Sequence, residues 1–445
     1  MTPQIDALLA GAPDLAARFA ARAAAHDRDA SFPTENIADL RAAGWPALTV
    51  PAEYGGMGAG LSDTVRAVEQ LAMGDGSTAL AFTMHLQTLG SAAESRAWPA
   101  AQFEAVCRAA VAGGALVNAC ASEPELGSPS RGGLPRTVAV PAAAPAPGWL
   151  ITGRKSFASM APVLDYFIIP AAIQGNAGVT GIEGNAGIEG SAGIEDRDDA
   201  IGRFLVPRSA GVQVEPNWDP MGMRATGSHD LELDGVWVAE DALLYRQSAA
   251  APDPSRAVVN AWFTLTVTAV YLGVGAAAMA AAVDYAHRRI PTGLGRPIAT
   301  LEAVERQVGQ MELGLRAARR VLYGVAADWD GSGGSDAPDA SGRSGGSDGT
   351  DASGRSGGSI ATAGSPERRA ELAFDIVAAK VFVTNAALEV TDRAMRVVGG
   401  AAMRRDLPLE RYFRDVRGGL YHPPSGEEAL RLLGRLGLER GKPKS

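Results

Sequence analysis

The chain has 445 residues, of which 46% are hydrophobic and 20% are charged. These shares are close to those of soluble globular proteins and exclude the collagen-like, disordered and disulfide-scaffold classes, while the length predicts two or three packed domains. The 50 acidic residues outnumber the 41 basic ones and give a net charge of −9, which disfavours binding to nucleic acid or anionic lipid and favours small-molecule chemistry.

The cysteines and the first residues bear on localisation. Cys107 and Cys120 are the only cysteines and form no CxxC pair, which fits a reducing compartment. Residues 1–6 have neither the basic nor the apolar region of a secretory signal, so we expect a cytoplasmic protein. The uncharged stretch 257–283 is long enough to span a membrane, but it is mostly Ala, Gly and Thr, and we expect a helix buried against other helices.

Residues 1–112 are predicted to form an N-terminal helical domain. Apolar residues recur there at helical spacing, and Gly and Pro residues at 44–46 and 51–58 predict turns between the helices. The segments with helical spacing are 5–24, 37–43, 61–73 and 101–111.

The pattern changes at residue 113. Short runs of β-branched and aromatic residues between Gly, Pro and Asp predict a central antiparallel β domain over 113–245. Long Ala- and Leu-rich segments over 246–445 suit a C-terminal helix bundle. The predicted fold class is therefore α+β, in the order helical domain, β domain and helix bundle.

Two segments of low complexity interrupt this order. Residues 175–195 repeat Gly-Asn-Ala-Gly and Gly-Ile-Glu, and residues 331–364 contain the same nine-residue run at 339–347 and 351–359. Neither has the apolar content that folding requires. We expect both insertions to be flexible surface loops.

Seven motifs follow one another along the rest of the chain. Ser122-Glu123-Pro124-Glu125-Leu126-Gly127-Ser128 is similar to a Thr-Glu-Pro-x-x-Gly-Ser signature, and 153–159 is similar to Gly-x-Lys-x-Trp-x-Ser/Thr, with Phe157 at the aromatic position. The other motifs lie at 50–58, 218–228, 285–298, 398–402 and 409–417. In this order and spacing they resemble the acyl-CoA dehydrogenase superfamily of flavoproteins.

The resemblance implies a noncovalent FAD and a homotetramer or homodimer in which the nucleotide end of the flavin reaches a neighbouring subunit. Hydroxyls suit the edges of a flavin ring, an aromatic side chain offers it a flat face, a guanidinium suits a pyrophosphate, and paired glycines permit close approach of a nucleotide. The flavin-binding residues expected from the resemblance are Ser122, Ser128, Phe157, Ser159, Arg289, Gly399 and Gly400.

The resemblance also predicts an acyl-CoA dehydrogenase-like enzyme. Such an enzyme oxidises an acyl-thioester with hydride transfer to N5 of FAD, and a carboxylate must remove the neighbouring proton. Most members have that carboxylate in a Tyr-Glu-Gly-Thr segment, where this chain reads Leu420-Tyr421-His422-Pro423. Some take it from an earlier helix, near Phe263 here, where no acid stands. Glu427 is an alternative base, although it also suits the first turn of a final helix.

Residues 414–422 resemble the ending of the flavin monooxygenase branch of the superfamily. In that branch a histidine, with a Ser or Thr near flavin N5, attends a C4a-hydroperoxide made from reduced flavin and oxygen. His422 can titrate near neutral pH and is the candidate catalytic residue. A reduced-flavin-dependent monooxygenase using FAD or FMN is therefore the alternative function, and a non-catalytic partner subunit is a third.

The remaining histidines predict no further chemistry. His85 lies in an apolar helical stretch and is expected to be a satisfied core residue, although it could face the same cavity. His26, His229 and His287 show no metal-ligand spacing, and no HExxH occurs, so no metal site is predicted.

Overall fold

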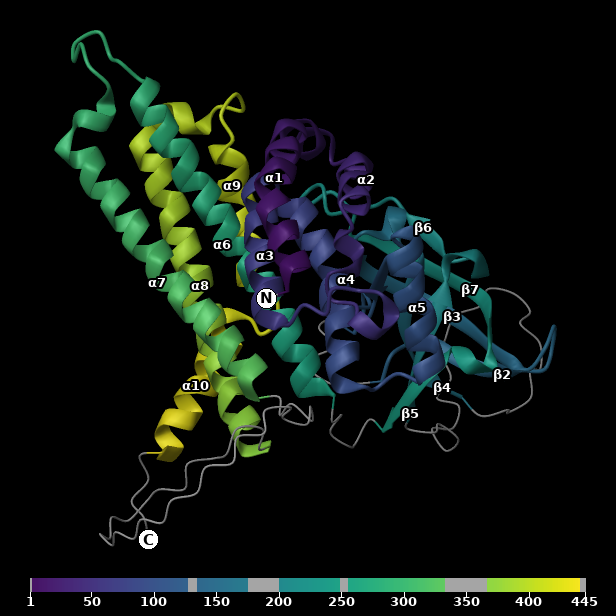
Figure 1. Ribbon diagram of the computed structural model, residues 1–445. Coiled ribbons are helices and arrows are strands. Elements are labelled where there is room, and N and C mark those ends of the chain that lie inside the picture. Colours follow the sequence, from purple (N-terminus) through teal and green to yellow (C-terminus); the bar gives the residue numbers. More distant parts are fainter. Residues whose placement is uncertain (1, 127–133, 175–199, 249–254, 333–365, 441–445) are drawn as a thin grey trace, which may run out of the picture.

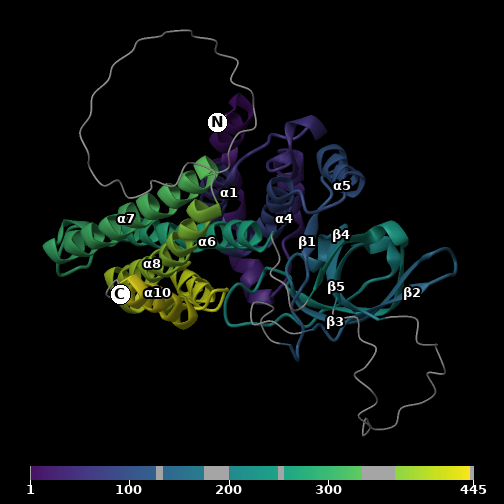
Figure 2. The ribbon, with the colours of Figure 1, turned by 90° about the horizontal axis from the view of Figure 1, so that it is seen from below.

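The computed structural model describes residues 2–126, 134–174, 200–248, 255–332 and 366–440. The predicted α+β fold is confirmed: the N-terminal helices lie between an eight-stranded β-sheet and the C-terminal helix bundle (Figures 1 and 2). The predicted insertion at 175–195 lies outside the described residues. So does the predicted insertion at 331–364, apart from Gly331 and Ser332, which end a helix.

The N-terminal region contains five α-helices among its described residues, and four of them match segments predicted from periodicity. The fifth, α4, is buried along most of its length, so it lacks the polar face that periodicity detects. Asp75 caps its start by accepting a hydrogen bond from the Thr78 amide at 3.0 Å. The helices are α1 (Pro3–Asp29), α2 (Thr34–Ala42), α3 (Leu61–Gly74), α4 (Gly76–Ser95) and α5 (Ala100–Gly113).

The sheet has the strand order β6-β7-β3-β2-β4-β5-β8, with β1 paired to β4. It is mixed, which corrects the prediction of an antiparallel domain, because β1 and β2 both run parallel to β4. The strands are β1 (Val117–Ala119), β2 (Val138–Ala142), β3 (Gly148–Ala158), β4 (Tyr166–Ile173), β5 (Ala200–Pro207), β6 (Gln213–Glu215), β7 (His229–Ala239) and β8 (Leu243–Ser248).

The parallel pairings leave a gap on one edge of β4. Cys120 N donates to the Ile168 carbonyl and Ala172 N to the Thr137 carbonyl, so β1 and β2 lie end to end along this edge. Pro170 faces the gap between them, where its missing N–H costs no ladder hydrogen bond. The chain between β1 and β2 leaves the sheet at this gap.

The C-terminal bundle surrounds α6. This helix packs against α3, α4, α7 and α8, and 78% of its most apolar 18-residue window is buried. It is long and apolar enough to cross a membrane, but its burial identifies it as the predicted core helix. The elements of the bundle are α6 (Arg256–Arg288), α7 (Glu302–Ser332), α8 (Pro366–Val398), α9 (Leu409–Asp415), the short 3-10 helix η10 (Val416–Leu420) and α10 (Gly426–Arg440).

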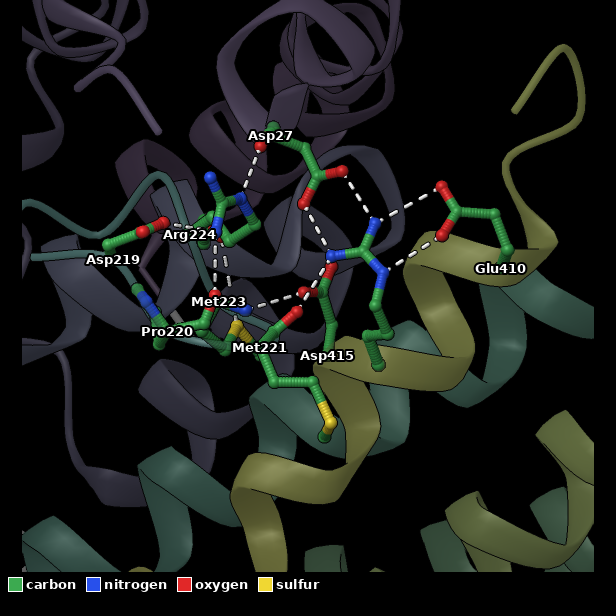
Figure 3. A network of polar contacts seen from close by, with 10 residues as sticks. Asp27, Asp219, Pro220, Met221, Met223, Arg224, Glu410 and Asp415 are labelled. Carbon is green, nitrogen blue, oxygen red and sulfur yellow. Dashed lines mark hydrogen bonds and ion pairs between the residues drawn. The ribbon is translucent and has the colours of Figure 1, made fainter. Parts of the chain in front are cut away.

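An ion-pair network joins the first helix to the last ones (Figure 3). Arg414 of α9 donates to both carboxylate oxygens of Asp27 in α1, at 2.9 and 2.6 Å, and to Glu410 at 2.8 Å. Arg224, in the loop between β6 and β7, donates to the Asp27 carbonyl and to Asp219, both at 2.6 Å. Arg224 therefore braces this loop against α1.

Removing this network should destabilise the fold. We expect Arg414→Ala to lower the free energy of unfolding by about 2–3 kcal/mol, because Asp27 and Glu410 lose charge-assisted hydrogen bonds. The measurement is urea denaturation. Arg404→Ala is the control: its ion pair with Asp406 is exposed, and we expect no measurable change. Equal losses in both variants would contradict a role for the network.

Candidate functional site

The first cluster of the site is built around His422, directly after η10. His422 Nδ1 lies 2.8 Å from Tyr271 Oη, in the middle of α6, and 3.0 Å from the Gly418 carbonyl oxygen. The ring of Phe263, two turns earlier on α6, has its centroid 6.2 Å from that of His422. The structure thus places the sequence-predicted histidine beside the α6 segment near Phe263, where the resemblance predicts the catalytic acid of some family members.

Both polar groups of this cluster are neutral at physiological pH. Burial lowers the pKa of His422 to about 4, opposed by the hydrogen bond to Gly418 and assisted by the charge of Lys380. Burial also raises the pKa of Tyr271 well above its ordinary value, with a contribution from Asp415. In the tautomer that donates Nδ1–H to Gly418, Nε2 is a free acceptor, because it has no hydrogen-bond partner among the described residues.

Among the described residues, no carboxylate group is bonded to the His422 side of this cluster. No described Asp or Glu forms a hydrogen bond or ion pair with His422. Glu427 lies exposed in the first turn of α10. Asp415 is buried, and burial raises its pKa to about 7, but its Oδ1 accepts the Met223 amide at 2.6 Å. That bond ties the β6–β7 loop to α9.

The second cluster is formed by the described part of the first motif, residues 122–126, and by the motif at 151–159. Ser156 N donates to the Ser122 carbonyl at 2.9 Å, which brings the two motif loops together. The hydroxyl of Ser156 is buried without a hydrogen-bond partner. Ser159 Oγ lies 2.8 Å from Ser228 Oγ, directly before the neighbouring strand β7.

Phe157 projects from this second cluster. It is 65% exposed although large and apolar, and its φ of +56° is rare for such a residue. Its ring meets the edge of Trp218 at a centroid distance of 5.8 Å. Strain of this kind concentrates at ligand sites, and the exposed ring of Phe157 can stack on a flat ligand.

A chain of contacts connects the two clusters. Trp218 Nε1 donates to the Met223 carbonyl at 3.1 Å, and the Met223 amide donates to Asp415. Asp415 lies one turn before Gly418. Phe157 and His422 are therefore linked through a single loop and the end of α9.

A buried ion pair supports the second cluster. Lys155 Nζ lies 2.7 Å from Glu123 Oε1 and donates to the Pro170 carbonyl at the gap in β4. Glu123 also accepts from the Thr137 hydroxyl at 2.6 Å and the Arg136 amide at 2.7 Å. Because Glu123 follows Ser122 in its loop and Lys155 lies in β3, the ion pair ties this loop to β3.

The structure does not bring the other predicted residues to these clusters. Arg289 ends α6, 18 residues or about 27 Å of helix beyond Tyr271, and is exposed. Gly399 and Gly400 are exposed at the end of α8, at the same end of the bundle (Figure 1). Ser128 lies outside the described residues.

Sequence reasoning missed Tyr271 and Lys380. Lys380 of α8 is only 4% exposed, and burial lowers its pKa to about 8. The one signal in the sequence is a single lysine in an otherwise apolar stretch at 376–383. Lys380 follows Ile376 by four residues and precedes Val383 by three, so it shares their buried helix face.

His85 is the predicted core residue. Its Nδ1 accepts the Val117 amide at 3.2 Å, so Nε2 donates to the Pro46 carbonyl at 2.9 Å. Both ring nitrogens are satisfied in the neutral form. Burial lowers the pKa of His85 to about 4.

This burial predicts a pH dependence of stability. Below pH 6.5 the unfolded chain binds a proton at His85, whereas the folded protein does so only near pH 4, so stability falls as the pH drops through this window. We expect His85 to account for a loss of about 2 kcal/mol between pH 7 and pH 5. Urea denaturation at both values measures it. An undiminished fall in the His85→Gln variant would contradict this origin.

Within the described residues, no group of three or more His, Cys, Asp or Glu side chains could hold a metal ion. The site therefore consists of a neutral Tyr–His pair beside one buried lysine, and of hydroxyls with an exposed aromatic ring. The first set can hold or move a proton, and the second can bind a flat ring.

The sequence is similar to those of known proteins over most of its length. The "Acyl-CoA dehydrogenase, N-terminal domain" pattern matches residues 2–97, and two patterns of the "Acyl-CoA dehydrogenase, C-terminal domain" match 265–345 and 359–421. The putative acyl-CoA dehydrogenase YdbM of Bacillus subtilis (strain 168) is 36% identical, covering 94% of this chain and 93% of its own. L-evernosamine nitrososynthase of a Micromonospora species is 30% identical, covering 95% and 88%.

A solved structure shares the fold as well. KijD3, solved in complex with FMN and dTDP-3-amino-2,3,6-trideoxy-4-keto-3-methyl-D-glucose, matches with a TM-score of 0.75 and 28% identity, covering 100% of this chain and 96% of its own. The resemblance predicted from the motifs is confirmed by these matches. The chain belongs to the acyl-CoA dehydrogenase family.

Proposed function

We propose that the protein is a flavin-dependent monooxygenase that acts on a small molecule. The observation that carries this proposal is the neutral Tyr271–His422 pair, which stands where dehydrogenation of an acyl-thioester needs a carboxylate base. Where the resemblance expects that base, this chain has His422 at one position and an uncharged stretch of helix near Phe263 at the other.

The second cluster suits a flavin, FMN or FAD. The unpaired buried hydroxyl of Ser156 is a donor available to a ligand, and Phe157 offers its exposed face to a ring. Ser122 and Ser159 stand beside them. The bound flavin would supply the reaction of a reduced ring with molecular oxygen, which no amino-acid side chain can perform.

The chain's own residues supply proton control. His422, neutral and with Nε2 free, can accept a proton from the substrate or donate one back. The hydroxyl of Tyr271 holds the imidazole ring of His422 in place through its 2.8 Å contact with Nδ1.

The nucleotide end of the flavin has its own predicted contacts, Arg289, Gly399 and Gly400. They would reach a flavin bound at the second cluster only if that flavin were bound to a neighbouring subunit. They follow the C-terminal ends of α6 and α8 in the bundle, whereas the Ser122 loop follows β1 of the sheet, so one chain does not bring the two sets together (Figure 1). This separation supports the homotetramer or homodimer expected from the family.

Acyl-CoA dehydrogenation is the second candidate function. The 36% identity to a putative acyl-CoA dehydrogenase favours it. In this case a base other than His422, such as Glu427, would have to approach the substrate, and Glu427 lies exposed on α10.

One experiment separates the two functions. The flavin-loaded protein is mixed anaerobically with a panel of acyl-CoAs while the absorbance of oxidised flavin is recorded. We expect no bleaching by any acyl-CoA. When the bound flavin is chemically reduced and mixed with oxygen, we expect the absorbance time course of its reoxidation to differ from that of free reduced flavin. Bleaching by an acyl-CoA would replace our proposal with dehydrogenation.

A further inference from the structure

We propose that Lys380 binds an anionic group of the substrate beside His422, so that the site takes a small carboxylate or a similar oxyanion. This inference rests on the proposed function, because it assigns the substrate class of the same site. It concerns binding and can be tested without turnover.

Lys380 is a buried cation without a partner. It is 4% exposed, yet it forms no hydrogen bond or ion pair with any described residue. The equally buried Lys155 is paired with Glu123 at 2.7 Å. A buried charge is destabilising unless it is paired or solvated, so an unpaired ammonium next to a candidate catalytic group is available to a ligand that compensates it.

The packing of α6 on α8 places Lys380 at the level of His422. The two helices run in the same direction (Figure 1), and a Cβ built on Gly275 would lie 3.2 Å from the Ala387 Cα. Seven residues earlier on each helix are Lys380 and Thr268, which are therefore at about the same height. Thr268 lies between Phe263 and Tyr271, whose rings flank His422.

Electrostatics agree with this placement. Burial is the main cause of the lowered pKa of His422, and the charge of Lys380 lowers it further. The ammonium group is thus close enough to His422 for its charge to act there.

A second unpaired donor lies one turn along α8. Thr384 is 1% exposed, and its hydroxyl has no hydrogen-bond partner. A Cβ built on Gly419 would lie 2.8 Å from Thr384 Cγ2, so Thr384 faces the η10 segment that carries His422. An ammonium and a hydroxyl together offer donors to an oxyanion, whereas Lys380 would repel a protonated amine.

Three probes with the same four-carbon chain length test this assignment: butyrate, its neutral isostere butyramide, and the cationic butylamine. Their binding to the full-length, FMN-loaded protein is measured by titration calorimetry. We expect butyrate to bind in preference to the neutral and the cationic probe. Lys380→Met should weaken butyrate binding by about 10- to 100-fold, as expected for loss of a charged hydrogen bond, while Lys380→Arg should retain most of it.

Matched variants separate binding from folding. Thr384→Val should weaken butyrate binding several-fold. Thr391→Val, on the same face of α8, should leave it unchanged, because the Thr391 hydroxyl is already bonded to the Ala387 carbonyl at 2.8 Å. Lys380→Met should unfold at no lower urea concentration than the wild type, because it removes an unpaired buried charge.

The outcomes are distinct from those of the functional test. Equal butyrate affinity in the wild type and in Lys380→Met, equal binding of the three probes, or no butyrate binding to the wild type would each overturn the assignment of Lys380. Bleaching of the flavin by acyl-CoAs would overturn the proposed function and leave these binding results unaffected.

Discussion

Replacing His422 with alanine is expected to lower turnover by about 10²–10⁴-fold, the range typical for a general acid or base. His422 Nε2 is the free proton-accepting atom of the Tyr271–His422 pair, and no described carboxylate is bonded to it that could take over its role. Turnover is measured with reduced flavin and a substrate identified from the carboxylates that bind. The flavin content of the purified variant is measured in parallel.

The flavin content decides how a loss is interpreted. We expect it to be unchanged, because His422 bonds to Tyr271 and Gly418 and not to the Ser122 and Ser159 loops. His85→Gln is a matched control, since His85 is a buried histidine satisfied by Pro46 and Val117. If His422→Ala loses flavin and activity together, or if both histidine variants lose activity equally, His422 has a structural role.

Tyr271→Phe tests the other half of the pair. It keeps the aromatic ring but removes the hydroxyl that lies 2.8 Å from His422 Nδ1. We expect a loss of turnover smaller than that of His422→Ala, because the Gly418 carbonyl still holds the imidazole. A loss as large as that of His422→Ala would make Tyr271 the proton-carrying group.

Local patterns were sufficient to predict most of the fold. Amphipathic spacing located α1, α3 and α5, since each has a buried and a solvated face. It did not locate α4, which is buried along most of its length. The parallel pairing of β1 with β4 was also not predicted, because it joins Val117 to Tyr166 through contacts that no local pattern encodes.

The candidate site could be predicted only where a motif carries it. His422 was found because its segment departs from the family pattern, and Phe157 because an aromatic is expected at its position. Tyr271 and Lys380 belong to no motif, and the face that each presents is set by how α6 and α8 pack. The same holds for Glu123 and Lys155: both stand in motifs, but only the three-dimensional structure brings their charges to 2.7 Å.

The Glu123–Lys155 pair is expected to be the most sensitive point of the β-sheet. Glu123→Gln should lower the free energy of unfolding by about 3–5 kcal/mol, because it leaves Lys155 buried with an uncompensated charge. Burial raises the pKa of Glu123, but Lys155 and the hydrogen bonds from Thr137 and Arg136 outweigh it and hold that pKa below its ordinary value. The stabilisation is therefore present at neutral pH and is lost as the pH falls through the pKa of folded Glu123.

Urea denaturation of three variants tests this origin of the loss. Glu104→Gln breaks an exposed ion pair with Arg108 and should leave stability nearly unchanged. The double variant Glu123→Gln, Lys155→Met should be more stable than Glu123→Gln alone, because the orphaned charge is gone. If the double variant is the less stable of the two, the cost lies in packing and not in the buried charge. Because Ser122 and Ser156 are held together above this pair, we also expect Glu123→Gln to retain less flavin than Glu104→Gln.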